Sequence, residues 1–480
     1  MNIIEEGMGA VPYPILAAPV PPSKPLPIWR FLPMQRDNTL ATYFAQAYEQ
    51  DFIERKLLWT SRCIVNEPNA IKHILLDNAA NYPKSVIMRR VLEAGLGRGL
   101  ITSEGATWRR DRKIMARSFD HRSIAAYSPI IGEICEALLA DWDSLPGGAE
   151  VDMADSMMYA TLHIISRAMF SSGSDEIADV LNAAMQRFQS EARPSLFDFM
   201  GFPQWVPRLS SIQNRKVRRH FDNVHKIIER LHDERKRAGD QAEKDLLSRL
   251  IMHEGEEAGS SMSPQEVRDQ MLTIFAAGHE TTAQALTWTW YLLSQHPEVE
   301  ARLHAELDAV LQGRAPRQED IGNLPYTRMV IEESMRLYPS VHTITRQALK
   351  DDEVQGHRIP AGATIIISPW LLHRKPGLWE NPGRFDPERF HPERAACRHR
   401  YAYIPFGGGP RICIGASFAM VEAMLIIASV AQRYRLRLKP GHPVEPQGLI
   451  TVRPRHGMKM LLERRADGNR RNDHGSMEIR

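Results

Sequence analysis

The sequence has few cysteines and no paired spacing among them. Its four cysteines are scattered over 480 residues, at positions 63, 135, 397 and 413, with no Cys-x-x-Cys pair and no disulfide framework. It also lacks a Gly-x-Gly-x-x-Gly phosphate loop after a strand and a cysteine-rich iron–sulfur run. The chain therefore has no built-in site for a nicotinamide or iron–sulfur electron donor, and its cysteine usage fits a reducing cytoplasm.

The sequence also has no large excess of positive or negative charge, and no long apolar run near its N-terminus. The formal net charge of +3 is too small for this length to indicate nucleic-acid binding. Residues 1–33 carry eight prolines, so the apolar stretch Ala10–Val20 cannot form a spanning helix of about 20 residues. Glu5 and Glu6 argue against a secretion signal. We expect an extended proline-rich arm, no transmembrane anchor and a cytoplasmic protein.

The composition is that of a folded, mostly helical protein. Hydrophobic residues make up 43% and charged residues 25% of the chain, which is ordinary for a globular protein. No long linker divides it, so we expect one helical body over 34–463 and a polar, frayed tail over 464–480. We expect helices at Ile124–Trp142, Val151–Phe170 and Ile177–Gln189. A small β region should span 348–368, and the glycine-rich segment 83–107 resembles a loop with short turns.

A long buried helix is predicted near the middle of the chain. Ser263-Pro-Gln-Glu266 is a capping box with proline at the first helical position, where its missing N–H costs nothing. The helix can run to His296, where Pro297 interrupts it. This gives about 32 residues and a length of roughly 48 Å. The segment Met271–Leu293 is apolar nearly all round, which indicates burial.

Polar residues interrupt this apolar helix at Ala277-Gly-His-Glu-Thr-Thr282. The glycine costs about 1 kcal/mol relative to alanine, and a threonine hydroxyl can bond back to the carbonyl four residues earlier. We therefore expect a local bulge or kink. A buried acid and hydroxyl there would form a route for protons, although a purely structural kink is the alternative.

A cysteine closes the glycine-rich loop Phe406-Gly-Gly-Gly-Pro-Arg-Ile-Cys-Ile-Gly415, which runs directly into an apolar helical stretch. Its glycines allow positive φ and close approach to a flat ligand. The positive charge of Arg411 and the start of the next helix favour the thiolate of Cys413. Because a thiolate is the form that binds metals, Cys413 is a candidate metal ligand. The alternative is a small buried hydrophobic residue.

The spacing Phe-x-x-Gly-x-Arg-x-Cys-x-Gly matches the haem-binding signature of the cytochrome P-450 superfamily, and the chain resembles the soluble, bacterial-type members. The resemblance implies haem b, with Cys413 as axial ligand of the iron. It gives Glu280 and Thr281 a catalytic role in delivering protons for oxygen activation. It also implies that seven residues contact the cofactor, namely Trp108, Arg112, Ala277, Arg346, Phe406, Arg411 and Gly415. Among these, the arginines and the tryptophan would hold the haem propionates. Glu333, Arg336 and Arg389 match its structural carboxylate–arginine network.

The resemblance further implies a monooxygenase that inserts one atom of O2 into a lipophilic small molecule, such as a fatty acid or terpenoid. Electrons would come from a ferredoxin and its reductase, or a flavodoxin-type donor. Basic residues near Trp108 would either dock this acidic partner or form an ordinary solvated face. Two competing classes are a haem sensor or electron carrier and a peroxide-driven or rearranging haem enzyme. Both have less need of the Glu280–Thr281 pair.

The substrate cavity should be lined by mostly apolar segments, namely 85–100, 190–206, Phe275–Thr281, Val341–Ile344 and Leu449–Ile450. Within the second of these, the aromatic stretch Leu196–Trp205 reads either as ordinary packing or as a gate at the substrate entrance with a shallow membrane contact.

Overall fold

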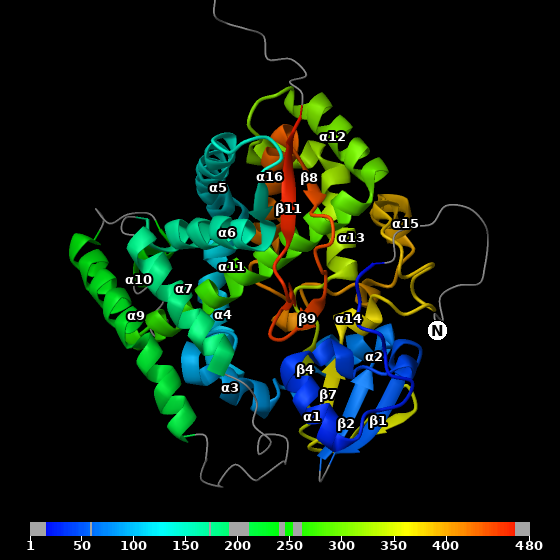
Figure 1. The fold of residues 1–480 in the computed structure, drawn as a ribbon. Coiled ribbons are helices and arrows are strands. Elements are labelled where there is room, and N and C mark those ends of the chain that lie inside the picture. The colour runs from blue at the N-terminus through cyan, green and yellow to red at the C-terminus, as the bar shows by residue number, and fades with distance from the viewer. Residues whose placement is uncertain are drawn as a thin grey trace, which may run out of the picture.

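The computed structural model describes residues 16–57, 60–171, 174–191, 211–239, 245–252 and 262–465. Helices cover most of this part of the chain (Figure 1). Their bounds are α1 Ile28–Asp37, α2 Pro68–Lys72, α3 Val86–Leu96, α4 Gly105–Ala116, α5 His121–Asp143, α6 Met153–Phe170, α7 Ser174–Glu191, α9 Ser211–Ala238, α10 Leu246–Met252, α11 Pro264–Gln295, α12 Pro297–Leu311, α13 Pro325–Leu337, α14 Pro369–Leu372, α15 Pro392–Ala396 and α16 Ala416–Arg433.

Within the described residues, the strands are short and form four small sheets. Their bounds are β1 Phe52–Leu57, β2 Thr60–Val65, β3 Glu150–Asp152, β4 Ile344–Gln347, β5 Asp352–Val354, β6 His357–Ile359, β7 Thr364–Ile367, β8 Tyr434–Leu438, β9 Pro446–Gly448, β10 Val452–Pro454 and β11 Lys459–Arg464. The expected mostly α, α+β fold is confirmed.

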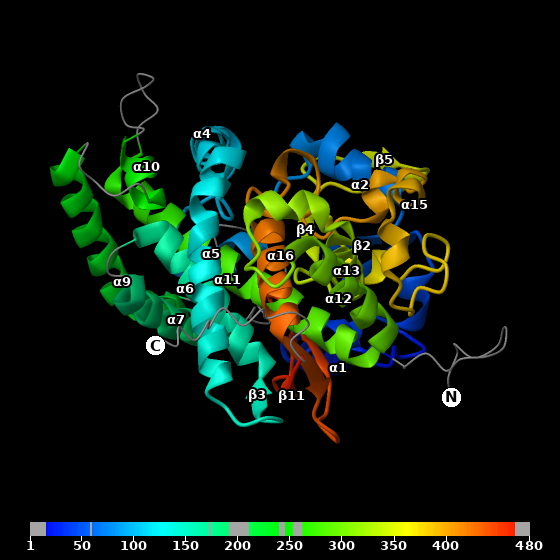
Figure 2. The ribbon, with the colours of Figure 1, turned by 90° about the horizontal axis from the view of Figure 1, so that it is seen from above.

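Helix α11 crosses the centre of the molecule, as its sequence predicts (Figures 1 and 2). It has 32 residues, and both hydrogen bonds of the capping box between Ser263 and Glu266 are present. It packs against α6, α13 and α16. The Trp288 ring stacks on Tyr338 with centroids 4.1 Å apart, and its indole N–H donates to the Val452 carbonyl at 2.9 Å. This anchoring fixes the polar middle of α11 relative to the surrounding loops.

The largest sheet has the strand order β1-β2-β7-β4 and lies beside α1 and α2 (Figure 1). Strands β2 and β7 are parallel, with Arg62 opposite Thr364 and Ile64 opposite Ile366. The β1–β2 and β4–β7 pairs are antiparallel. Strand β7 lies within the β region that the sequence predicts over 348–368. This sheet carries the segment 340–347 to its place beside α11.

Two local predictions are wrong. Segment 83–107 is not a loop, because α3 and the start of α4 lie within it. Its glycines serve close packing instead, since a Cβ on Gly99 would lie 1.9 Å from the Thr273 hydroxyl of α11. The N-terminal arm is not extended from Ile28 onward, where α1 begins. Proline density excludes a long helix but permits one of ten residues, in which Pro27 is the N-cap and Pro33 lies inside the helix.

Two described helices, α5 and α16, have the length and apolarity of a membrane span, with 44% and 61% of their most apolar windows buried. Strand β11 continues to Arg464, one residue into the segment expected to be a frayed tail. The aromatic stretch Leu196–Trp205 lies outside the described residues.

Candidate functional site

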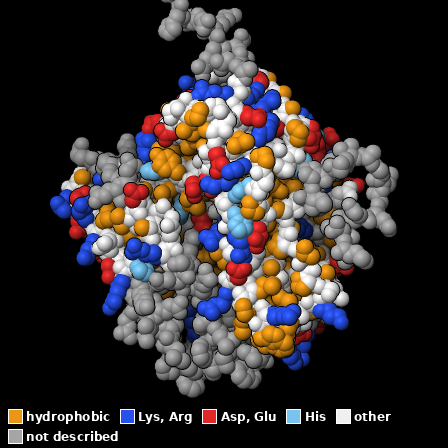
Figure 3. All heavy atoms as spheres, viewed as in Figure 1, with side chains coloured by type: hydrophobic (Ala, Val, Ile, Leu, Met, Phe, Trp, Pro, Cys, Tyr) orange, Lys and Arg blue, Asp and Glu red, His pale blue; other side chains and the backbone are white. Residues whose placement is uncertain are grey.

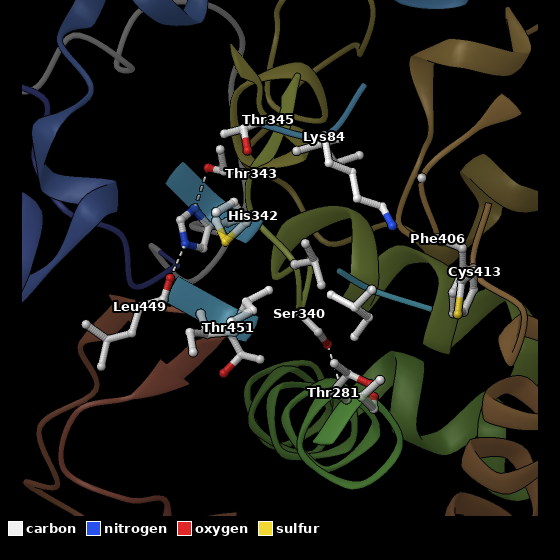
Figure 4. A pocket seen from close by; sticks show the side chains of 18 of the residues that line it. Lys84, Thr281, Ser340, His342, Thr343, Thr345, Phe406, Cys413, Leu449 and Thr451 are labelled. Carbon is white, nitrogen blue, oxygen red and sulfur yellow. Dashed lines mark hydrogen bonds between the residues drawn. The ribbon is translucent and has the colours of Figure 1, made fainter. Parts of the chain in front are cut away.

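The site is a cavity of about 1020 Å³ between α11, α16 and the cysteine loop. The predicted lining segments 85–100, Val341–Ile344 and Leu449–Ile450 all contribute to it, as does the Ala276–Thr281 face of α11. Figure 4 shows Cys413 and Thr281 on walls of this cavity, with His342 farther along it. The cavity also reaches segments that the sequence did not indicate, on α1, β1, β2 and β7.

Cys413 lies just before α16 with its side chain open to the cavity. Its backbone N–H donates to the Phe406 carbonyl at 2.9 Å, which closes the loop. Burial within the protein raises the pKa of the thiol, while the Gly415 backbone and the Arg112 charge lower it. Arg411, which we expected to favour the thiolate, pairs with Glu104 instead. A metal that takes this sulfur as thiolate must therefore displace a proton.

Two glycines of the loop, Gly408 and Gly409, serve a different purpose from the one expected. Gly409 has φ +67°, and a Cβ there would lie 1.8 Å from the Leu75 carbonyl oxygen. A Cβ on Gly408 would lie 2.7 Å from the Tyr401 ring. These two glycines therefore let the loop press against the protein behind it. Gly407 and Gly415 have no atom closer than 3.8 Å at the Cβ position and line the cavity.

The middle of α11 presents small residues to the cavity. Ala277 is exposed there and Gly278 and Thr281 are half-exposed, although the rest of the helix is mostly buried. The Thr281 hydroxyl donates to the Ala277 carbonyl at 2.7 Å. This is the predicted back-bonding, but the α-helix is continuous from Pro264 to Gln295. The expected bulge does not interrupt it.

Glu280 is only 7% exposed and lines the cavity beside Thr281. The Thr451 hydroxyl donates to its Oε1 at 2.6 Å. At the next residue of the helix, the Ser340 hydroxyl donates to the Thr281 carbonyl at 2.7 Å. The Glu280 carboxylate and the Thr281 backbone carbonyl are thus each held by a loop that borders the cavity.

His342 joins those two loops. One of its ring nitrogens lies 2.8 Å from the Leu449 carbonyl and the other 2.8 Å from the Thr343 hydroxyl (Figure 4). Burial lowers the pKa of His342 to about 4, so its ring is neutral near pH 7. A neutral ring donates to the carbonyl through one nitrogen and accepts from the hydroxyl through the other. Nothing in the sequence pattern distinguishes this histidine.

Basic side chains gather at the cysteine end of the cavity. The Arg411 guanidinium lies 4.3 Å from the Trp108 ring centroid and the Arg112 guanidinium 5.9 Å from it. Burial and the Arg411 charge lower the pKa of Arg346 to about 10. Arg411 also pairs with Glu104, yet its buried Nη1 has no hydrogen-bond partner. The structure therefore brings together the four residues that were expected to hold carboxylate groups.

Lys84 belongs to the same group and was missed. Its amine donates to the Leu100 and Ser103 carbonyls at 2.8 and 3.2 Å. Burial, followed by repulsion from Arg411, lowers the pKa of Lys84 to about 7, although Glu104 opposes this shift. A lone lysine in a segment interpreted as a loop gives no signal of this position.

The carboxylate–arginine network lies behind the loop, away from the cavity. Arg336 donates to both carboxylate oxygens of Glu333, at 2.7 and 2.8 Å, and Arg389 donates to the same carboxylate at 3.3 Å. Arg336 is fully buried and also donates to the carbonyls of His373, Pro382 and Arg384. It therefore ties α13 to the irregular chain that precedes the cysteine loop.

Comparisons with known proteins agree over most of the chain. The family model "Cytochrome P450" matches residues 19–460. Cyclooctatin synthase of Streptomyces melanosporofaciens is 37% identical over 387 residues, which is 80% of this chain and 83% of that protein. Pentalenene oxygenase of Streptomyces avermitilis is 31% identical over 419 residues, which is 87% of this chain and 91% of that protein. The crystal structure of the cytochrome P450DA heme domain is 24% identical in sequence and superposes with a TM-score of 0.80. The match covers 94% of this chain and 99% of that one.

Proposed function

The chain belongs to the cytochrome P450 family, whose members carry haem b, and we propose that this monooxygenase inserts one oxygen atom of O2 into a terpenoid or similar lipophilic molecule. The observation that carries the proposal is the position of Cys413 and Thr281 on walls of one largely apolar cavity (Figure 4). The terpenoid class is supported by bacterial relatives that oxidise terpenoids.

The residues at the cysteine end fit a haem. The open Cys413 sulfur offers an axial ligand, and Gly407 and Gly415 leave space where side chains would intrude. The buried Nη1 of Arg411 has no hydrogen-bond partner and can donate to an anion. A haem propionate is an anion that would accept charge-assisted hydrogen bonds there. We therefore propose that Cys413 binds the iron and that Trp108, Arg112, Arg346 and Arg411 hold the propionates. Ala277 and Phe406 would pack on the macrocycle.

When bound, the haem supplies the oxygen-activating chemistry. The protein supplies geometry and protons. Because the Thr281 hydroxyl donates to Ala277, its lone pairs are left to accept a hydrogen bond from a water in the cavity. Glu280, oriented by Thr451, stands next along the helix as the proton source. We propose that protons reach the cavity through these two side chains.

The electrons are proposed to come from a separate ferredoxin with its reductase, or from a flavodoxin-type donor, in the cytoplasm. On α4, Arg109 and Lys113 are exposed at the surface. Exposed basic side chains at these two positions would attract an acidic partner.

A spin-state screen tests the function. The purified holoenzyme is titrated with a terpenoid library and a matched set of straight-chain lipids, and compounds that shift the haem from low to high spin are incubated with reductant and O2. We expect terpenoids to shift the spin state and to yield oxygenated products that require both reductant and O2. Products from straight-chain lipids alone would contradict the terpenoid class. Turnover driven by peroxide without reductant would favour the competing class of haem enzyme.

A further inference from the structure

A chain of hydrogen-bonded polar side chains lies on one wall of the cavity. The Tyr43 hydroxyl lies 2.8 Å from the Thr343 hydroxyl, which in turn lies 2.8 Å from Nδ1 of His342. Nε2 of His342 lies 2.8 Å from the Leu449 carbonyl. All four residues line the cavity, and Tyr43 and His342 are buried. Figure 4 shows His342 and Thr343 well away from Cys413, so this wall faces the part of a substrate that is distant from the haem iron.

The Leu449 carbonyl fixes the direction of each hydrogen bond in this chain. A carbonyl can only accept, so Nε2 of His342 carries a hydrogen. Because the ring is neutral near pH 7, its Nδ1 carries none and accepts from the Thr343 hydroxyl. Thr343 has a single hydroxyl hydrogen, so its oxygen can only accept from Tyr43. The hydroxyl hydrogens of both residues are therefore used within the chain.

Ser368 leaves these directions unchanged. Its hydroxyl is a second hydrogen-bond partner of the Tyr43 hydroxyl, but its own hydrogen goes to the His342 backbone carbonyl at 2.8 Å. Whichever neighbour takes the Tyr43 hydrogen, the Tyr43 and Thr343 oxygens offer lone pairs to the cavity and no hydrogen. Each oxygen can accept one more hydrogen bond.

Apolar side chains adjoin the two hydroxyls. Phe44 follows Tyr43 and Ile344 follows Thr343 in the sequence, and both line the cavity. Farther out, apolar side chains gather on the surface where α1 lies, among them the exposed Trp29 (Figures 1 and 3). The two acceptors thus lie among surfaces suited to a carbon skeleton. A substrate group that meets them must match their hydrogen-bonding character, because an unmatched polar group is costly to bury.

We propose that the Tyr43 and Thr343 oxygens accept the hydroxyl hydrogen of an alcohol, so that the substrate already carries a hydroxyl group before this enzyme oxidises it. A ketone has no hydrogen to give, and its lone pairs would face theirs. The preceding reaction must then install that hydroxyl, either by water capture of a carbocation or by an earlier oxygenation. The inference rests on the proposed function, because it names one group of the substrate in the same cavity.

Four probes separate the polar group from the skeleton. They are the sesquiterpenoids nootkatol and nootkatone and the straight-chain pair dodecan-2-ol and dodecan-2-one, titrated into the holoenzyme with the haem spin shift as readout. Within each pair the skeleton is the same and only the alcohol can donate. In the wild type we expect the alcohol to bind about three- to tenfold more tightly than its ketone, the usual effect of one neutral hydrogen bond.

Variants of the two hydroxyls carry the test, because arginine side chains also line the cavity and can donate to a ketone. Thr343→Val combined with Tyr43→Phe removes both acceptors, and alcohol and ketone should then bind within about twofold of each other. The His342 ring loses its partner with either ligand, so that loss cancels in the ratio. Thr343→Ser keeps the hydroxyl and should keep the preference for the alcohol.

Thr289→Val is the matched control. The Thr289 hydroxyl is buried and donates to the Ala285 carbonyl at 2.7 Å, and Thr289 does not line the cavity. This variant should keep the wild-type ratio of alcohol to ketone binding. The reduced carbon-monoxide spectrum of each variant reports whether the haem site is folded.

Two results would overturn the inference. One is that neither alcohol binds more tightly than its ketone in the wild type, and the other is that the preference survives unchanged in the double variant. The inference and the proposed function fail separately. If nootkatone is oxidised as well as nootkatol and the variants change nothing, only the alcohol site fails. If dodecan-2-ol is preferred through Tyr43 and Thr343 and neither sesquiterpenoid binds, only the terpenoid class fails.

Discussion

At the scale of single residues, the site depends on side chains whose hydrogen bonds are committed before any ligand arrives. Thr281 is an example, because its proton is given to Ala277 and its hydroxyl oxygen can only accept from the cavity. Glu280 is held by Thr451. Such fixed partners orient the proposed proton route without requiring rearrangement during turnover.

Replacing Thr281 tests this route. We expect Thr281→Ala to divert electrons into hydrogen peroxide and to lower product formed per electron pair by at least about tenfold, because a positioned proton donor typically contributes a hundredfold or more. Peroxide and product are measured against reductant consumed. Thr287→Ala is the control, since Thr287 makes the same back-bond to Ala283 at 2.8 Å outside the cavity. Wild-type coupling in Thr281→Ala would refute the role.

Glu422 on α16 gives a pH prediction. It is 1% exposed, and burial raises its pKa from 4.5 to about 8, with the Thr282 hydroxyl opposing the shift. The folded state therefore holds a proton that the unfolded state releases between about pH 4.5 and 8, and stability falls as pH rises through this window. Ionising the buried group costs at most about 5 kcal/mol, at 1.36 kcal/mol for each pH unit between 4.5 and 8.

Glu422→Gln should remove this loss. Urea unfolding of both proteins at pH 5.5 and pH 9 should show the variant gaining stability relative to the wild type at the higher pH. Comparing the two proteins cancels the other groups that titrate in the same range. If the difference between them is the same at both pH values, Glu422 is not a buried neutral acid.

At the scale of secondary-structure elements, the buried guanidinium of Arg336 connects α13 to the chain before the cysteine loop through three carbonyls and Glu333. Arg336→Lys keeps the charge but cannot supply the five donors. We expect a loss of about 3–5 kcal/mol in stability, as for other broken buried pairs, and poor haem retention. Thermal unfolding and the haem-to-protein ratio measure both.

The control for that prediction is Arg328→Lys on the same helix, where an exposed arginine pairs with Glu332 at 3.2 Å. An exposed i,i+4 pair contributes about 0.3–0.5 kcal/mol, so this variant should behave like the wild type. If the two variants are equally stable, the buried network does not hold the loop.

The elements were predictable where one local signal decided the outcome. The capping box at Ser263 and the apolar run of α11 set both its start and its burial. The glycines of 83–107 misled because they serve close packing against Thr273, which only the folded chain reveals. Cys413 was recognisable from its local motif. By contrast, Lys84 reaches the cavity through tertiary contacts that no local pattern records. His342 lies within the predicted lining segment Val341–Ile344, but the sequence does not show that its ring joins this segment to Leu449.

At the scale of the whole molecule, the net charge is small and the basic residues are locally grouped. If Arg109 and Lys113 attract an acidic donor, the reduction rate with ferredoxin should fall steeply between low and physiological salt, because exposed charges are screened beyond about 8–10 Å. Exchanging both residues for glutamine should flatten that dependence. A salt-independent rate in the wild type would place the docking face elsewhere.

At this scale the structure places the cysteine loop and the residues of the proposed proton route, Glu280 and Thr281, on one cavity. Each part is separable by experiment, but all of them depend on Cys413 binding the haem iron through sulfur.

The reduced carbon-monoxide difference spectrum measures that most directly. The wild type and a Cys397→Ser control, which changes an exposed cysteine outside the described cavity lining, should both give the red-shifted Soret band typical of a thiolate ligand. Cys413→His should lose that band while the protein stays folded. An unchanged spectrum in Cys413→His would contradict the account.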